Sequence, residues 1–132
     1  MKITNYSKNL LIKSAHEWEV DREYFEPLYN YLIHGFHPGG FWAAVLSNDF
    51  YGAIQRSHPA NQVTALKKAS GWIGDRFPRS AWGNPDRVDQ WLSATDEERR
   101  LELEKHKLVY TEQQEVEMAL RGVDATELQV LW

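Results

Sequence analysis

The chain has 132 residues, no cysteine, six tryptophans and a formal net charge of −4. This length suits one domain with an ordinary core, and the lack of cysteine excludes disulfides, thiolate metal sites and cysteine nucleophiles. The charge is too mild to indicate a nucleic-acid binder, and no apolar run reaches the roughly 20 residues that a membrane-spanning helix needs. The N-terminal residues lack the pattern of a signal peptide. We therefore expect a cytoplasmic protein without direct contact to nucleic acid or membrane.

The first secondary-structure element that the sequence predicts clearly is a helix from residue 26 onwards. Residues 1–20 give no clear pattern, since Leu10–Ile12 fit a short strand as well as a helical turn. Glu26-Pro27 predicts a helix start, because proline suits the first helical position. Gly35 predicts the end of this helix, where a left-handed residue is needed.

The stretch over about 41–56 follows a turn at Pro38-Gly39-Gly40 and is the most informative part of the chain. It fits a single helix with apolar side chains on opposite faces. Such a helix is typical of a protein interior, so we expect a buried central helix. This helix would carry Asn48 and Asp49 into the buried region, where a carboxylate needs a partner.

Shorter helices are predicted further along the chain. One spans roughly 59–75, and another has Asn84 as its N-cap and Pro85 as its first residue and runs to about Leu92. Two capping-box patterns predict the last helices, at Thr95 with Glu98 and at Thr111 with Gln114. The expected fold is all-α, a compact bundle of about five to six short helices with a polar C-terminal helical hairpin. The apolar tail 128–132 fits a docked strand or a helix end.

Charge divides the chain into two parts. Residues 1–95 hold 10 basic and 9 acidic side chains, whereas residues 96–132 hold 5 basic and 10 acidic ones. Within 56–87 six basic side chains face two acidic ones. We therefore expect a helical core domain over 1–93 and an acidic C-terminal segment over 94–132, packed on the core or projecting from it. Solvated helix faces would produce the same asymmetry as partner surfaces.

Several short runs agree in order with one group of proteins. The shared pattern is Y-I-x-x-G, then P-G-G-F, then A-V-L-x-N-D, and later W-G-S-P before a short helix with a tryptophan. The matching positions are Tyr31, Ile33, Gly35, Pro38, Gly39, Gly40, Phe41, Ala44, Val45, Leu46, Asn48, Asp49, Ala53, Arg56, Trp82, Gly83, Pro85, Val88 and Trp91. The chain thus resembles small uncharacterised phage and prophage proteins over about 31–92, departing from them at Trp42, Ser57-His58 and Asn84. The resemblance implies a phage origin and a location in the cytoplasm of an infected host bacterium.

A candidate small-ligand site comprises Asn48, Asp49, Arg56, Arg79, Trp82 and Arg87. Its arginines would bind an anionic group and Trp82 would stack on a base. The alternative is structural, with Asp49 accepting N–H groups from the 82–85 turn. Both interpretations stay open at this point.

Other patterns favour structural roles. His34 and His37 have a spacing that can suit a metal, with His58 as a third ligand, but Gly35 and Pro38 interrupt the helix between them. The Pro38-Gly39-Gly40 turn lacks the G-x-x-x-x-G-K-[ST] pattern and a preceding strand. We expect no metal, no cofactor and no catalytic set of Ser, His and Asp.

The pattern as a whole favours binding over catalysis. We expect a non-enzymatic phage accessory protein that binds and inhibits a host defence component, through exposed aromatics and acidic side chains. The acidic candidates are Glu97, Glu98, Glu102, Glu104, Glu112 and Glu115. The alternative is a protein that binds and sequesters a small anionic ligand, such as a nucleotide signal.

Overall fold

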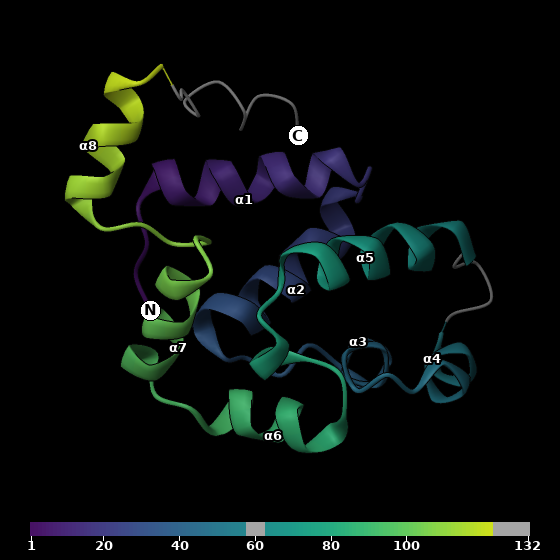
Figure 1. Ribbon diagram of the computed structural model, residues 1–132. Helices are drawn as coiled ribbons and strands as arrows, with labels where there is room; N and C mark the ends of the chain where they lie inside the picture. The colour runs from purple at the N-terminus through teal and green to yellow at the C-terminus, as the bar shows by residue number, and fades with distance from the viewer. Residues whose placement is uncertain (58–62, 123–132) are drawn as a thin grey trace.

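The computed structural model describes residues 1–57 and 63–122. Within these ranges the chain forms eight α-helices, one short 3-10 helix and no strand (Figure 1). The elements are α1 (Asn5–Glu17), α2 (Arg22–His34), α3 (Gly40–Leu46), α4 (Phe50–Arg56), α5 (Val63–Arg76), η1 (Arg79–Ala81), α6 (Pro85–Ser93), α7 (Asp96–Lys105) and α8 (Glu112–Leu120). The all-α prediction is confirmed. The predicted number of five to six helices is too low, because residues 1–20, where the sequence gives no clear pattern, contain α1, and the predicted single helix over 41–56 is two helices.

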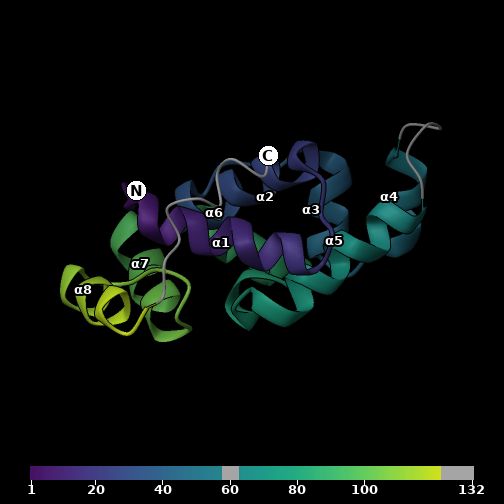
Figure 2. The same cartoon turned by 90° about the horizontal axis from the view of Figure 1, so that it is seen from above.

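Helix α2 runs through the middle of the molecule. Its buried residues are Phe25, Leu28, Tyr29, Tyr31, Leu32 and Ile33. Helix α7 packs on α2, α1 packs on α5, and α3 packs on both α4 and α6. The first view and the view from above agree that α4 and α8 lie at opposite ends of the molecule (Figures 1 and 2). The central buried helix is therefore α2, not the predicted helix over 41–56.

Two buried side chains tie α2 to the segments beneath it in Figure 1. The hydroxyl of Tyr31 donates a hydrogen bond to the carbonyl of Ala81 at 2.6 Å. The indole N–H of Trp91 donates to the carbonyl of Tyr31 at 3.1 Å. Burial raises the pKa of Tyr31 far above its usual value, so the hydroxyl stays protonated and keeps its donor role.

The N-terminal residues that gave no clear pattern form α1, so Leu10–Ile12 are helical. Thr4 caps this helix by accepting a hydrogen bond from the N–H of Ser7 at 3.2 Å. Inside the molecule, the indole N–H of Trp72 on α5 donates to the hydroxyl of Ser14 at 2.9 Å. Burial against α5 thus selects the helical conformation that the local sequence leaves open.

Helix α2 begins before the predicted start at Glu26-Pro27. Asp21 is its N-cap residue, and Pro27 lies inside the helix. The missing N–H of Pro27 removes a bond only to the carbonyl of Glu23, which is in the first turn at an exposed end. The predicted end is confirmed, because Gly35 follows the helix with φ of 66°.

The predicted single helix over 41–56 is wrong, because the chain turns between α3 and α4. Asn48 adopts a left-handed φ of 63°. Its N–H donates to the carbonyl of Val45 at 3.0 Å, and the N–H of Asp49 donates to the carbonyl of Ala44 at 2.8 Å. These two bonds form a Schellman motif, which closes a helix and satisfies its last carbonyls. Asparagine tolerates the left-handed conformation better than most residues.

The later caps agree with the sequence. Asn84 accepts a hydrogen bond from the N–H of Arg87 at 2.9 Å and precedes Pro85 at the first position of α6. Both predicted capping boxes are present, at the starts of α7 and α8. Helix α5 ends before Phe77-Pro78 as predicted, whereas its expected start near residue 59 and the tail 128–132 lie outside the described residues.

The C-terminal segment contributes to the same core as the rest of the chain. Leu103 of α7 and the following Leu108 and Val109 are fully buried in one cluster with residues of α1, α2 and α5. Helix α8 has no buried residue. Its Glu115 accepts hydrogen bonds from the hydroxyls of Thr4 and of Ser7, the latter at 2.8 Å, which attaches α8 to the start of α1. None of the helices described here is long and apolar enough to span a membrane.

Candidate interaction surface

Asn48 and Asp49 are exposed, contrary to the predicted burial. The Asp49 carboxylate caps α4 by accepting a hydrogen bond from the N–H of Gly52 at 2.9 Å. Its other oxygen lies 3.9 Å from Arg56 Nη1. Both side chains are more than half exposed, so this ion pair contributes little to stability. Asp49 is thus a local cap for the helix that it precedes.

We expect substitutions at Asn48 to reveal the helix break. Asn48→Ala should lower the free energy of unfolding by about 1 kcal/mol, because alanine lacks the short polar side chain that lets asparagine adopt the left-handed conformation, whereas Asn48→Gly also removes the Cβ and should be neutral or stabilising. Chemical denaturation measures both. A continuous helix would reverse the order, with alanine the more stable variant. The matched control is exposed Gln55 inside α4, where glycine should be the less stable substitution.

Helix α4 presents large apolar side chains to solvent. Phe50 is 48% exposed, Tyr51 76% and Ile54 59%, and only Gly52 and Ala53 of this helix are buried. A Cβ at Gly52 would lie 2.6 Å from Arg56 Nη1 and closer still to the carboxylate of Asp49, which are the ends of exposed side chains that can move aside. The buried residues of α4 are thus small, and its large apolar side chains are left outside.

The loop from η1 to α6 gathers three of the predicted ligand residues. The Arg79 guanidinium lies 4.6 Å from the ring centroid of Trp82. The Trp82 indole N–H donates to the carbonyl of Phe77 at 3.2 Å, and Arg87 Nη1 donates to the carbonyl of Trp82 at 3.4 Å. Gly83 has φ of 118°, and a Cβ there would lie 2.8 Å from Arg87 Nη1. Trp82 therefore has its ring face and its polar groups engaged within the loop.

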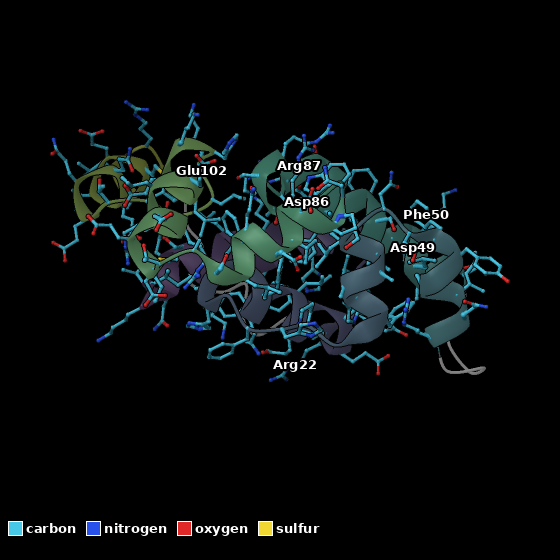
Figure 3. The ribbon with its side chains drawn as sticks, turned by 90° about the horizontal axis from the view of Figure 1, so that it is seen from below. Arg22, Asp49, Phe50, Asp86, Arg87 and Glu102 are labelled. Atoms are coloured by element: carbon cyan, nitrogen blue, oxygen red, sulfur yellow. The ribbon has the colours of Figure 1, made fainter. Side chains whose placement is uncertain are left out.

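A backbone hydrogen bond connects this loop to α3. The N–H of Gly83 donates to the carbonyl of Leu46 at 2.7 Å, two residues before Asn48. The predicted link between the 82–85 turn and the region of Asp49 thus exists, but it uses the main chain of Leu46 and not the carboxylate. The view from below shows Asp49 and Phe50 close together at the start of α4, whereas Arg87 lies beside Asp86 in a separate group (Figure 3).

Four of the six acidic candidates make contacts inside the protein. Glu98 belongs to the capping box of α7, and Glu115 binds Thr4 and Ser7. Glu102 accepts a hydrogen bond from Ser80 at 3.1 Å, and Glu104 lies 3.7 Å from Arg100. The remaining candidates, Glu97 and Glu112, are exposed. Much of the negative charge of this segment thus positions its own helices.

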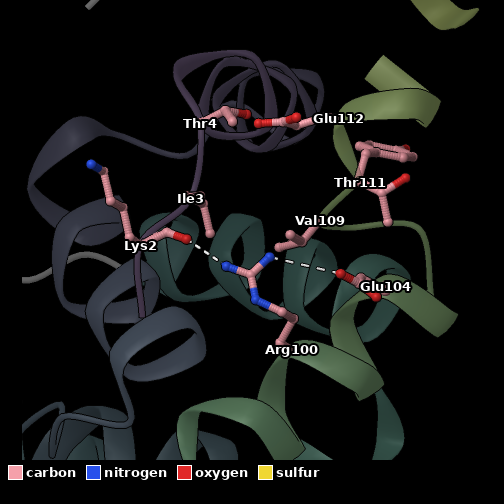
Figure 4. A pocket seen from close by; sticks show the side chains of 9 residues that line it. Lys2, Ile3, Thr4, Arg100, Glu104, Val109, Thr111 and Glu112 are labelled. Atoms are coloured by element: carbon pink, nitrogen blue, oxygen red, sulfur yellow. Dashed lines mark hydrogen bonds and ion pairs between the residues drawn. The ribbon is translucent and has the colours of Figure 1, made fainter. Parts of the chain in front are cut away.

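A hollow of about 470 Å³ opens between the N-terminal residues, α7 and the start of α8 (Figure 4). Arg100 lies across it, with Nη2 donating to the carbonyl of Lys2 at 2.6 Å and Nη1 directed to Glu104. The lining also includes Lys2 and Glu112, so its charges balance. This balance gives no preference for an anion or a cation.

Sequence patterns missed a partly buried charge cluster next to Gly35. Arg99 is 4% exposed, and its guanidinium pairs with Asp96. The Met1 ammonium lies 3.4 Å from Asp96 and 3.1 Å from Nδ1 of His34. A hydrogen bond from the ammonium, with Arg99, lowers the pKa of Asp96, and burial together with the ammonium lowers the pKa of His34. These contacts join distant parts of the chain, so local spacing carries no signal for them.

The histidine and glycine motifs occupy helix ends. His34 is the last residue of α2, and the ring of His37 accepts a hydrogen bond from the N–H of Gly39 at 3.0 Å. His58 lies outside the described residues. Over 1–57 and 63–122 no three His, Asp or Glu side chains gather closely enough to hold a metal ion.

No protein-family model, curated protein or solved structure matches this chain. The resemblance to phage and prophage proteins therefore stays a prediction from the residues that carry it.

Proposed function

We propose that this chain is a non-enzymatic accessory protein of phage origin that binds and inhibits a bacterial defence protein. One observation supports a binding role most directly: α4 exposes Phe50, Tyr51 and Ile54 while only two small residues anchor it. Aromatic and large apolar side chains gathered on a surface are typical of protein interaction sites. The phage origin rests on the residue pattern over 31–92.

The partner surface that we propose is α4 with the adjoining 79–87 loop, and we call it the α4 surface. Arg56 lies on α4 and pairs with Asp49, and the loop, which the hydrogen bond from Gly83 to Leu46 attaches to the end of α3, adds Arg79 and Arg87. Aromatic and arginine residues are enriched among those that dominate binding energy. The partner should offer an apolar groove with acidic groups at its rim, because helix faces bind such grooves through neighbouring apolar anchors.

The acidic segment has a smaller part in this proposal than the sequence alone suggests. Glu98, Glu102, Glu104 and Glu115 already make contacts within the protein. Exposed Glu97 and Glu112 lie in α7 and α8, away from α4, so they contribute only to the long-range field of the protein, which affects the rate of association more than the affinity.

The alternative of a small anionic ligand has one favourable observation, since Arg79, Trp82 and Arg87 lie together. However, Arg79 already covers the Trp82 ring, so a base would have to displace it. A thermal-shift measurement with a panel of nucleotides tests this alternative. A specific ligand at 100 times its dissociation constant adds about 2.7 kcal/mol to the stability.

The protein-binding proposal is tested by affinity purification from bacterial lysate with a C-terminal tag, because the Met1 ammonium is buried. We expect the wild-type chain to recover a stoichiometric defence protein and to inhibit its activity in a purified assay. A variant with Phe50, Tyr51 and Ile54 changed to serine should lose both, since truncating central anchors costs about 2 kcal/mol or more each.

The matched control changes Val116 and Leu120 to serine, because these apolar side chains of α8 are also exposed but lie at the opposite end of the molecule. This control should bind and inhibit like the wild type. Equal binding by the α4 variant, or a partner recovered without inhibition, would refute the proposal.

A further inference from the structure

The first residues of the chain are attached where α2 ends and α7 begins, apart from the α4 surface. The side chain of Met1 is 2% exposed and packs against the core. Its ammonium lies 3.4 Å from Oδ2 of Asp96 and 3.1 Å from Nδ1 of His34. An ammonium can only donate hydrogen bonds, so Nδ1 must accept this one. The contact therefore requires a neutral His34 ring, with its proton on Nε2.

The charges around His34 oppose protonation of its ring. Over 1–57 and 63–122, three cations and one carboxylate act on it: the Met1 ammonium, Lys8 of α1, and Arg99 with Asp96 of α7. Arg99 and the ammonium share that carboxylate, so in this part of the chain no anion remains to balance a charged imidazole. Burial, and then the ammonium, lowers the pKa of His34, although the end of a helix favours a charged histidine. A proton on Nδ1 would also replace the hydrogen bond with the repulsion of two cations.

Residues 2–4 follow this contact and form one wall of the hollow of about 470 Å³ (Figure 4). The carbonyl of Lys2 accepts a hydrogen bond from Arg100 at 2.6 Å, and Thr4 caps α1. Neither of these contacts involves a group that titrates near neutral pH, whereas a histidine changes its charge between about pH 5 and 8. The contact of the ammonium is thus the attachment of these residues that a modest change of pH can break.

We propose that the Met1 ammonium, His34 and Asp96 form an acid-sensitive latch, which holds residues 1–3 at the wall of the hollow and releases them when His34 gains a proton. In the released state His34 has its ordinary pKa of about 6.5. The attached state binds this proton more weakly, so attachment is complete above that pH and is lost as the pH falls below it. One proton changes the equilibrium by up to about tenfold per pH unit. The latch does not depend on the α4 surface.

The test measures how fast an aminopeptidase removes Met1 from the full chain, relative to a synthetic peptide of residues 1–8. The peptide corrects for the effect of pH on the aminopeptidase, and cleavage of the chain follows the population of the released state. Between about pH 7.5 and 5.5 the relative rate should rise by roughly five- to tenfold. The near-ultraviolet circular dichroism of the chain should stay constant, because the core remains folded.

Two variants assign the effect to the latch. His34→Asn offers an acceptor oxygen close to the place of Nδ1 and cannot be protonated, so its relative rate should be the same at both pH values. Asp96→Asn removes the carboxylate that pairs with the ammonium and should be cleaved faster than the wild type already at the higher pH. The control is Glu97→Gln, because Glu97 is exposed in the same turn of α7.

The control should behave like the wild type at both pH values. A wild-type rate that changes by less than about twofold, or an equal rise in His34→Asn, would overturn the proposal. Wild-type behaviour of Asp96→Asn would also overturn it. Each of these outcomes leaves the α4 surface untouched.

Discussion

Trp72→Ala is expected to lower the free energy of unfolding by about 3–5 kcal/mol, because it removes the largest fully buried side chain of residues 1–57 and 63–122. The Trp72 ring stacks on Phe25 with centroids 5.5 Å apart and meets Phe77 edge-on at 5.0 Å. Its indole N–H also donates to Ser14, whose hydroxyl would lose a buried partner. Chemical denaturation followed by circular dichroism measures the loss.

Two control variants show whether the loss of stability comes from lost packing at Trp72 or whether any substitution destabilises the chain. Trp72→Phe keeps most of the ring volume, so it should cost clearly less than the alanine variant. Leu120→Ala changes a side chain that is 83% exposed and should stay within about 0.5 kcal/mol of the wild type. A small effect of Trp72→Ala would mean that α1, α2 and α5 do not share this contact.

Leu103→Ala is expected to cost about 2–5 kcal/mol, although it lies in the mostly charged helix α7. Leu103 is fully buried, and its carbonyl accepts hydrogen bonds from the N–H groups of Leu108 and Val109 at 2.9 and 3.3 Å. The loss should appear in one cooperative transition, because α7 packs on α2 within the common core.

The same argument predicts the result of a truncation. A chain ending at residue 93 should unfold, because removing α7 exposes the apolar side chains against which Leu103 packs. For the substitution Leu103→Ala, the matched control is Leu101→Ala on the same helix, where the side chain is 61% exposed and little stability should be lost. A folded 1–93 fragment would instead support the domain boundary expected from the charge distribution.

The sequence predicts helix ends well where a cap is local. Asn84-Pro85, Thr95 with Glu98 and Thr111 with Gln114 each lie within three residues of the N–H group that they satisfy. Such patterns do not depend on the rest of the fold.

The helix break at Asn48 could not be predicted by periodicity. A helical wheel assigns each residue an angle and does not detect where a helix ends. Here the residue that adopts the left-handed conformation and ends the helix is Asn48, not a glycine. Glu19 and Lys107 close α1 and α7 in the same way, with φ of 57° and 60°. The apolar content of α4 then misleads, because apolar side chains on a surface look identical in sequence to buried ones.

The candidate site was predictable only in part. Arg79, Trp82 and Arg87 lie close in the sequence and are close in the fold. The hydrogen bond from Gly83 to Leu46 and the contact of Glu115 with Ser7 join residues that are far apart along the chain. Local patterns carry no information on such contacts.

The most direct test of the α4 surface is the stability of the triple variant with Phe50, Tyr51 and Ile54 changed to serine. Because these side chains are exposed, the free energy of unfolding should change by about 1 kcal/mol or less while partner binding is lost. Buried side chains would cost about 2–5 kcal/mol each and unfold the chain. A variant that fails to fold would therefore contradict an exposed apolar face on α4, and with it the proposed function.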